Sequence, residues 1–71
     1  MPNNVKTLRL AQHISQKDLA ASVGITRQTL SLIEKFDYNP SLKLCILICQ
    51  QLNQTLDAVF WPTDNEGKSS I

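Results

Sequence analysis

The 71-residue sequence has little of what enzymes and membrane proteins usually need. It contains one histidine, two cysteines and two glycines, with no glycine-rich phosphate loop and no cluster of histidine and carboxylates. We therefore expect no enzyme activity, no cofactor and no metal site. No apolar run reaches the roughly 20 residues that cross a bilayer, and no signal peptide is evident. With so few cysteines, these absences favour a reducing, cytoplasmic location and no contact with membranes.

Charge of one sign is also scarce, since the formal net charge is only +1. The apolar fraction of 42% is ordinary, and the long like-charge runs of disordered chains are absent. We expect one small folded domain over residues 1–62 and a flexible polar tail over 63–71. Four cations should lie on one side of that domain, although scattered, solvated side chains explain them equally well. These four are Lys17, Arg27, Lys35 and Lys43.

Two adjacent segments carry paired helix signals. Residues 16–23 and 27–35 are each preceded by a capping residue, Ser15 and Thr26, and Gly24 suits the left-handed turn between them. The predicted inward residues are Leu19, Ala20, Val23, Leu30 and Ile33. Two short capped helices joined by such a turn match the helix-turn-helix unit, in which the second helix reads DNA.

Three more helices complete the prediction, which is all-α with five helices and no strand. The first covers residues 5–12, and the last covers 56–61 behind the cap Thr55. The fourth runs to about residue 52, with Asn39 as its cap and Pro40 in its first turn. Its predicted buried side consists of Leu42, Cys45, Ile46, Ile48, Cys49 and Leu52.

The two cysteines stand four residues apart on this fourth helix. That spacing is compatible with half of a metal site or with a redox switch, but no further ligands are evident. Buried thiols are the favoured interpretation of Cys45 and Cys49.

Helical geometry selects the candidate DNA-reading residues. If Leu30 and Ile33 point inward, four side chains point outward and Arg27 lies at the edge; the four are Gln28, Ser31, Leu32 and Lys35. Arginine can bind guanine, glutamine can bind adenine, and leucine can contact a thymine methyl group. We expect Arg27, Gln28, Ser31 and Leu32 to read bases, with phosphate binding as the alternative for Arg27.

Phosphate contacts are expected around this helix. The helix that Gln16 opens presents free backbone amides, and Asn39 and Ser41 stand before another helix. Such contacts position a protein on DNA without reading its sequence. The predicted phosphate-binding residues are Gln16, Lys17, Thr26, Lys35, Tyr38, Asn39, Ser41 and Lys43.

The chain resembles the Cro/cI-type, or Xre-type, helix-turn-helix family over about residues 4–61. The resemblance rests on Leu8-Arg9, on the pattern ISQxxLAxxVGITRQTLxxIE from residue 14, and on YNPSL from residue 38. It implies a compact, lambda-repressor-like domain of five helices that binds operator DNA as a homodimer. It also implies that Arg9 and Glu34 form a structural ion pair, with DNA contact as the alternative for Arg9.

Some positions depart from the family pattern. Phe36 stands where relatives often have glycine or asparagine, and Leu10 and Leu47 replace polar residues. These leucines could be half-buried or could mark a second contact surface. The apolar end of the domain is the predicted dimer contact, formed by Val59, Phe60 and Trp61.

The predicted function is a transcriptional regulator, acting as a repressor on a pseudo-palindromic, double-stranded DNA operator. The alternative is a protein-interaction module, or an antitoxin that binds a protein partner, built on the same fold. Low net charge and the apolar side chains of Leu10, Leu32 and Leu47 favour this alternative.

Overall fold

The computed structural model describes residues 2–60 and contains, within that range, five helices and no strand. The helices are α1 (Val5–Ala11), α2 (Gln16–Val23), α3 (Arg27–Glu34), α4 (Leu42–Leu52) and α5 (Leu56–Phe60). This confirms the all-α prediction, with the first and third helices each one residue shorter than expected. Trp61 and the predicted tail, 63–71, lie outside the described residues, so the domain boundary remains a prediction. No helix in the described part is long and apolar enough to span a membrane.

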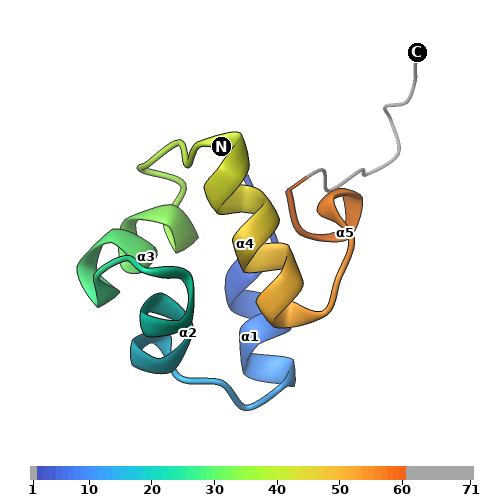
Figure 1. Cartoon of the computed structure of the whole chain (residues 1–71), viewed down its shortest axis with the longest axis horizontal. Helices are drawn as coiled ribbons and strands as arrows, with labels where there is room; N and C mark the ends of the chain where they lie inside the picture. Colours follow the sequence, from blue (N-terminus) through green and yellow to red (C-terminus); the bar gives the residue numbers. More distant parts are fainter. Residues whose placement is uncertain (1, 61–71) are drawn as a thin grey trace.

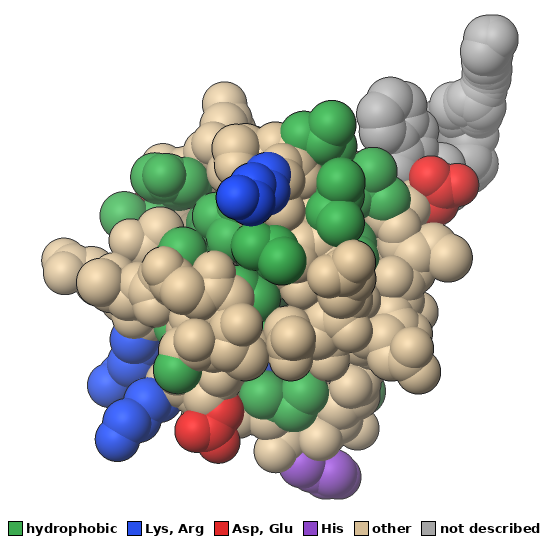
Figure 2. Space-filling view, viewed as in Figure 1, with side chains coloured by type: hydrophobic (Ala, Val, Ile, Leu, Met, Phe, Trp, Pro, Cys, Tyr) green, Lys and Arg blue, Asp and Glu red, His purple; other side chains and the backbone are tan. Residues whose placement is uncertain are grey.

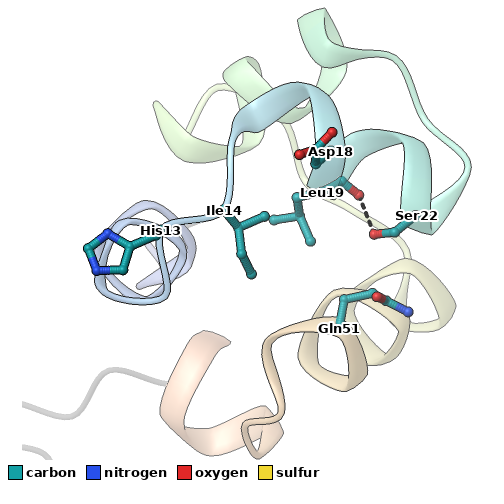
Figure 3. A pocket seen from close by; sticks show the side chains of 6 residues that line it. All are labelled: His13, Ile14, Asp18, Leu19, Ser22 and Gln51. Atoms are coloured by element: carbon teal, nitrogen blue, oxygen red, sulfur yellow. Dashed lines mark hydrogen bonds between the residues drawn. The ribbon is translucent and has the colours of Figure 1, made fainter.

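Side-chain caps begin α2 and α3 as predicted. The Ser15 hydroxyl accepts a hydrogen bond from the Asp18 backbone N–H at 3.0 Å, and the Thr26 hydroxyl accepts one from the Thr29 N–H at 3.0 Å. Figure 3 shows the side chains of Ile14 and Leu19 directed toward each other across the start of α2. This apolar contact is the expected hydrophobic staple, which fixes the angle at which the chain enters the helix.

The start of α4 differs from the prediction. Ser41, not Asn39, is the cap, and its hydroxyl accepts from the Leu44 N–H at 3.1 Å. Pro40 is buried and precedes the helix instead of occupying its first turn. Both Asn39 and Ser41 are good caps, so residue type alone did not distinguish the two starts.

Helices α1 to α4 all end in the same way, with a left-handed residue followed by a backbone hydrogen bond that spans five residues. The left-handed residues are His13, Gly24, Phe36 and Asn53. After α3, for example, the Asp37 N–H donates to the Leu32 carbonyl at 2.9 Å. This is the Schellman pattern, which satisfies carbonyls that would otherwise lack partners. Only one of the four is glycine, so the other three adopt a conformation that a Cβ atom disfavours.

Phe36→Gly should therefore stabilise the protein. Phe36 has φ +67° and its side chain is 50% exposed, so the backbone relief should exceed the lost packing. We expect a gain of about 1 kcal/mol, which corresponds to a rise in melting temperature of about 4–8 °C. Gly24→Ala is the matched control and should lose about as much, because Gly24 has φ +78° and no atom lies within 4 Å of the added Cβ. A less stable Phe36→Gly variant would show that packing of the ring outweighs the backbone strain.

Helix α4 lies at the centre of the fold, where it contacts α1, α2 and α5 (Figure 1). All five residues predicted to point inward from α2 and α3 are buried in the core. On α4 the prediction is partly wrong, because Leu42 is 66% exposed and Ile46 is 42% exposed. Of the two leucines for which the sequence left half-burial or a contact surface open, Leu47 is half-buried against the core, whereas Leu10 is exposed. Helix α4 is apolar on more than one side, so hydrophobic periodicity does not reveal its buried face.

Cys45 and Cys49 are free and buried within the core. Burial raises the pKa of both thiols above the usual value, and the proximity of Cys45 adds to the rise at Cys49. The thiol, not the reactive thiolate, is therefore favoured near neutral pH. This agrees with the structural interpretation of both cysteines.

Residues at the N-terminus tie α3 and α5 together. The Asn3 side chain donates to the Ile33 carbonyl at 2.9 Å and accepts from the Val5 N–H at 3.0 Å. Asn4 makes no side-chain cap; its amide instead donates to the Ala58 carbonyl at 2.8 Å. Both asparagines therefore make hydrogen bonds to residues distant in the sequence.

The predicted dimer contact is wrong for two of its three residues. Val59 is fully buried and Phe60 is 6% exposed, both within the core of one chain. They point inward because α5 packs against α1 and α4, so neither side chain is available to a second copy.

Candidate nucleic-acid interface

Helix α3 is held by a buried face and presents an exposed one. Leu30 and Ile33 are fully buried. On the other side Arg27, Gln28 and Leu32 are exposed, and Ser31 is half-buried. The outward direction inferred from helical geometry therefore agrees with the accessibility of these side chains.

A shallow groove of about 410 Å³ runs between the first residues of α2 and α3. It is lined by Gln16, Arg27, Gln28 and Ser31. The structure thus brings three of the four predicted base-reading residues together with one predicted phosphate ligand. Leu32 lies farther along α3 and does not line the groove.

A buried ion pair between Arg9 and Glu34 lies next to the residues that line this groove. The Arg9 Nε donates to Glu34 Oε2 at 2.8 Å, and both side chains are less than a tenth exposed. Arg9 also donates from Nη1 to the Ile14 carbonyl at 2.8 Å. These contacts join α1, the α1–α2 loop and the end of α3, so Arg9 is held inside the protein.

Gln16 links this ion pair to the groove. Its Nε2 donates to Glu34 Oε1 at 3.0 Å, and its Oε1 accepts from Arg27 Nε at 3.5 Å. Sequence reasoning assigned Gln16 only to phosphate binding. No local signal could have revealed the second role, because Glu34 stands 18 residues away in the chain.

The predicted phosphate ligands lie in two groups on either side of α3. Gln16 and Lys17 line a second hollow of about 470 Å³, together with Arg9, Ser15 and Arg27. The other group occupies the loop between α3 and α4 and the start of α4 (Figure 1); its members are the exposed residues Tyr38, Asn39, Ser41 and Lys43. Lys35 is exposed at the end of α3.

Thr26 and Ser41, like Gln16, also have a structural task. The hydroxyl oxygens of Thr26 and Ser41 cap α3 and α4. A hydroxyl that accepts one hydrogen bond retains a hydrogen to donate. Ser41 can therefore cap α4 and still bind a phosphate oxygen, whereas the Thr26 hydroxyl also pairs with the Thr29 hydroxyl at 2.9 Å.

The basic character of this side is modest. Figure 2 shows Lys and Arg side chains projecting at the lower left, where α2 and α3 lie, with an acidic side chain close to them. A further cation lies over the start of α4, surrounded by apolar side chains. Local charge therefore adds to binding of a polyanion but does not alone explain it.

Another hollow, of about 330 Å³, lies between α2 and α4 and is lined in part by His13, Asp18 and Gln51. In Figure 3 the imidazole of His13 projects away from the other lining side chains. Within residues 2–60, no three side chains of the metal-ligating types are grouped to hold an ion. The groove at α3 is therefore the stronger candidate site.

Comparisons with known proteins agree with this geometry. A helix-turn-helix family model matches residues 5–59. The chain is 48% identical over 61 residues to YgzD, an uncharacterized HTH-type transcriptional regulator of Bacillus subtilis (strain 168), covering 86% of this chain and 92% of that protein. It is 38% identical over 66 residues to a Methanocaldococcus jannaschii protein with the same description, covering 93% and 100% of the two chains.

The matched range includes all five helices except the last residue of α5, and it includes every residue that lines the groove at α3. The predicted resemblance is confirmed, and the chain belongs to the Cro/cI-type, or Xre-type, helix-turn-helix family of DNA-binding transcriptional regulators.

Proposed function

We propose that this protein represses transcription by occupying a pseudo-palindromic operator as a homodimer, with α3 in the major groove. The observation that carries the proposal is the groove in which Gln16, Arg27, Gln28 and Ser31 meet. The groove combines side chains of the reading surface, which consists of the base-reading residues of α3 (Arg27, Gln28, Ser31 and Leu32), with the start of α2, whose free backbone amides can bind a phosphate oxygen. A rigid scaffold beneath a polar reading surface is what direct recognition of bases requires.

Each of the four predicted base-reading side chains on α3 has a chemical task in this proposal. The guanidinium of Arg27 binds the O6 and N7 edge of guanine, and the amide of Gln28 binds the N6 and N7 edge of adenine. Leu32 contacts a thymine methyl group, while the small side chain of Ser31 permits close approach. The two groups of phosphate ligands then hold the DNA backbone on both sides of α3.

Dimerisation requires a surface that remains free while α3 contacts DNA. Leu42, Ile46 and Leu56 are exposed apolar residues on α4 and α5, and none of them belongs to the reading surface. Figure 2 shows apolar side chains gathered over this part of the molecule. We assign the dimer contact to these three residues, in place of Val59 and Phe60. A two-fold dimer places half-sites about 34 Å apart.

Ile46→Glu should weaken self-association at least about tenfold, because the contact would have to bury the new carboxylates of both copies. The mass measured by sedimentation should shift from dimer toward monomer at equal protein concentration. Leu10→Glu is the matched control, since Leu10 is also exposed but lies on α1. An unchanged dimer in Ile46→Glu, or dissociation in Leu10→Glu, would place the contact elsewhere.

The function itself is tested by selecting binding sites from a random duplex pool. The wild type should recover a pseudo-palindrome, and an Arg27→Ala/Gln28→Ala double variant should not. The spacing between half-sites gives the geometry of the dimer. No enriched sequence at low salt would contradict the regulator proposal.

A protein-interaction module, including an antitoxin, is the second candidate. The exposed apolar side chains of Leu10 and Leu32 favour it, as does the net charge of only +1. Salt separates the two functions, because affinity for DNA falls steeply as salt rises and an apolar protein contact does not respond in that way.

A further inference from the structure

A continuous set of hydrogen bonds connects the buried ion pair to the reading surface. Arg9 donates to both carboxylate oxygens of Glu34, at 2.8 and 3.3 Å. The Oε1 atom of Glu34 also accepts from Gln16 at 3.0 Å, and Gln16 accepts from Arg27 at 3.5 Å. Side chains of α1, α2 and both ends of α3 thus form one network.

Electrostatics fixes the direction of the amide in this network. The carboxylate of Glu34 attracts the N–H side of the Gln16 amide, which turns the amide oxygen toward the guanidinium of Arg27. A flipped amide would place its oxygen against the carboxylate and its N–H group against the cation. Both contacts would be repulsive, so the negative charge of Glu34 selects the orientation seen.

The same orientation of the Gln16 amide leaves the terminal N–H groups of the Arg27 guanidinium available for DNA. Gln16 engages only Nε, one of the five N–H donors of a guanidinium. Gln16 does not engage the two terminal nitrogens, which can bind a guanine edge. Ordering the side chain before DNA arrives lowers the entropy that binding must otherwise remove.

We propose that the Arg9–Glu34 ion pair is a positioning unit for base recognition, which acts on Arg27 through Gln16. This rests on the proposed function, in which Arg27 reads a base. Glu34 is buried, with its side chain only 3% exposed, so it cannot touch DNA directly. Any effect of Glu34 on base preference must therefore pass through other side chains.

Glu34→Gln tests the proposal while preserving the size of the side chain. Preference for the base opposite Arg27 should fall about three- to tenfold, the amount expected when one side chain must be ordered on binding. Preference is a ratio of two affinities, so a fraction of unfolded protein lowers both affinities equally and cancels. Gln16→Met, which removes both hydrogen bonds at similar length, should give the same loss.

The Arg27→Ala background supplies the control. Both substitutions should leave base preference unchanged there, because no guanidinium remains to be positioned. If Gln16→Met instead lowers affinity equally for every sequence in both backgrounds, and Glu34→Gln changes no preference, then Gln16 is only a phosphate contact and the proposal is wrong.

A measurement on the free protein, without DNA, tests whether Arg27 is positioned, independently of whether the protein binds an operator. Nuclear magnetic relaxation of the Arg27 Nε–H group should report a restricted side chain in the free wild type and a mobile one in both variants. Equal mobility in all three proteins would overturn the positioning role even if the wild type binds an operator. Restricted motion in the wild type alone would support it even if the selection finds no operator.

Discussion

Glu34→Ala should lower the free energy of unfolding by about 3–5 kcal/mol, the largest effect on stability that we expect from a polar substitution in this chain. Arg9 is 6% exposed, and its Nε and Nη2 atoms both donate to Glu34. Removing the carboxylate leaves a buried guanidinium without its counter-charge. For a domain of this size the melting temperature should fall by more than about 12 °C.

Thermal unfolding followed by circular dichroism measures this loss. The matched control is Arg9→Met/Glu34→Leu, which replaces both charges with apolar side chains. It should recover most of the stability, because the penalty arises from the unpaired charge and not from the missing attraction. A loss below about 1 kcal/mol in Glu34→Ala, as is typical of exposed ion pairs, would show that the carbonyl of Ile14 alone satisfies the arginine.

Gln28→Ala should produce the second large effect, on DNA recognition. A bidentate contact to a base gives about 1–3 kcal/mol of discrimination, so preference at one operator position should fall about five- to 150-fold. Gln28 is exposed at the first turn of α3, away from buried Leu30 and Ile33, and the melting temperature should therefore stay unchanged. Affinities for a set of operators randomised at single positions measure the effect.

Lys17→Ala is the control for this second experiment. Lys17 is exposed and assigned to phosphate, so its loss should weaken binding to all sequences alike and reduce the slope of affinity against salt by about one. Equal preference of Gln28→Ala and wild type at every position would remove Gln28 from the reading surface. A loss confined to one position in Lys17→Ala would show that this lysine reads a base.

Local features were the easiest to predict from the sequence. The caps Ser15 and Thr26 and the turn at Gly24 depend on hydrogen bonds between residues only a few positions apart, so residue type alone indicates them. The buried face of α3 follows from Leu30 and Ile33, which lie three residues apart on one side of a helix. The same reasoning indicated which side of α3 is exposed.

Two of the incorrect predictions concern features that the sequence left ambiguous: the residue that caps α4 and the side of α5 that points inward. Asn39 and Ser41 are both suitable caps, and the structure has Ser41, with Pro40 buried before the helix. The described part of the fifth helix has five residues, little more than one turn, so its inward side is not evident from periodicity. Its contact with α1 and α4 buries Val59 and Phe60, which the sequence had suggested as a surface.

The sequence by itself determined the helices, most of the core and the residues that α3 exposes, because each depends on neighbours within one or two turns. The family resemblance implied the pairing of Arg9 with Glu34, 25 positions away. Only the tertiary structure decided that Glu34 also meets Gln16, 18 positions away. Such contacts depend on the angles at which whole helices pack, and every buried side chain contributes to those angles. For that reason the side chains that α3 exposes were predictable from the sequence, whereas the contacts of Gln16 with Glu34 and Arg27 were not.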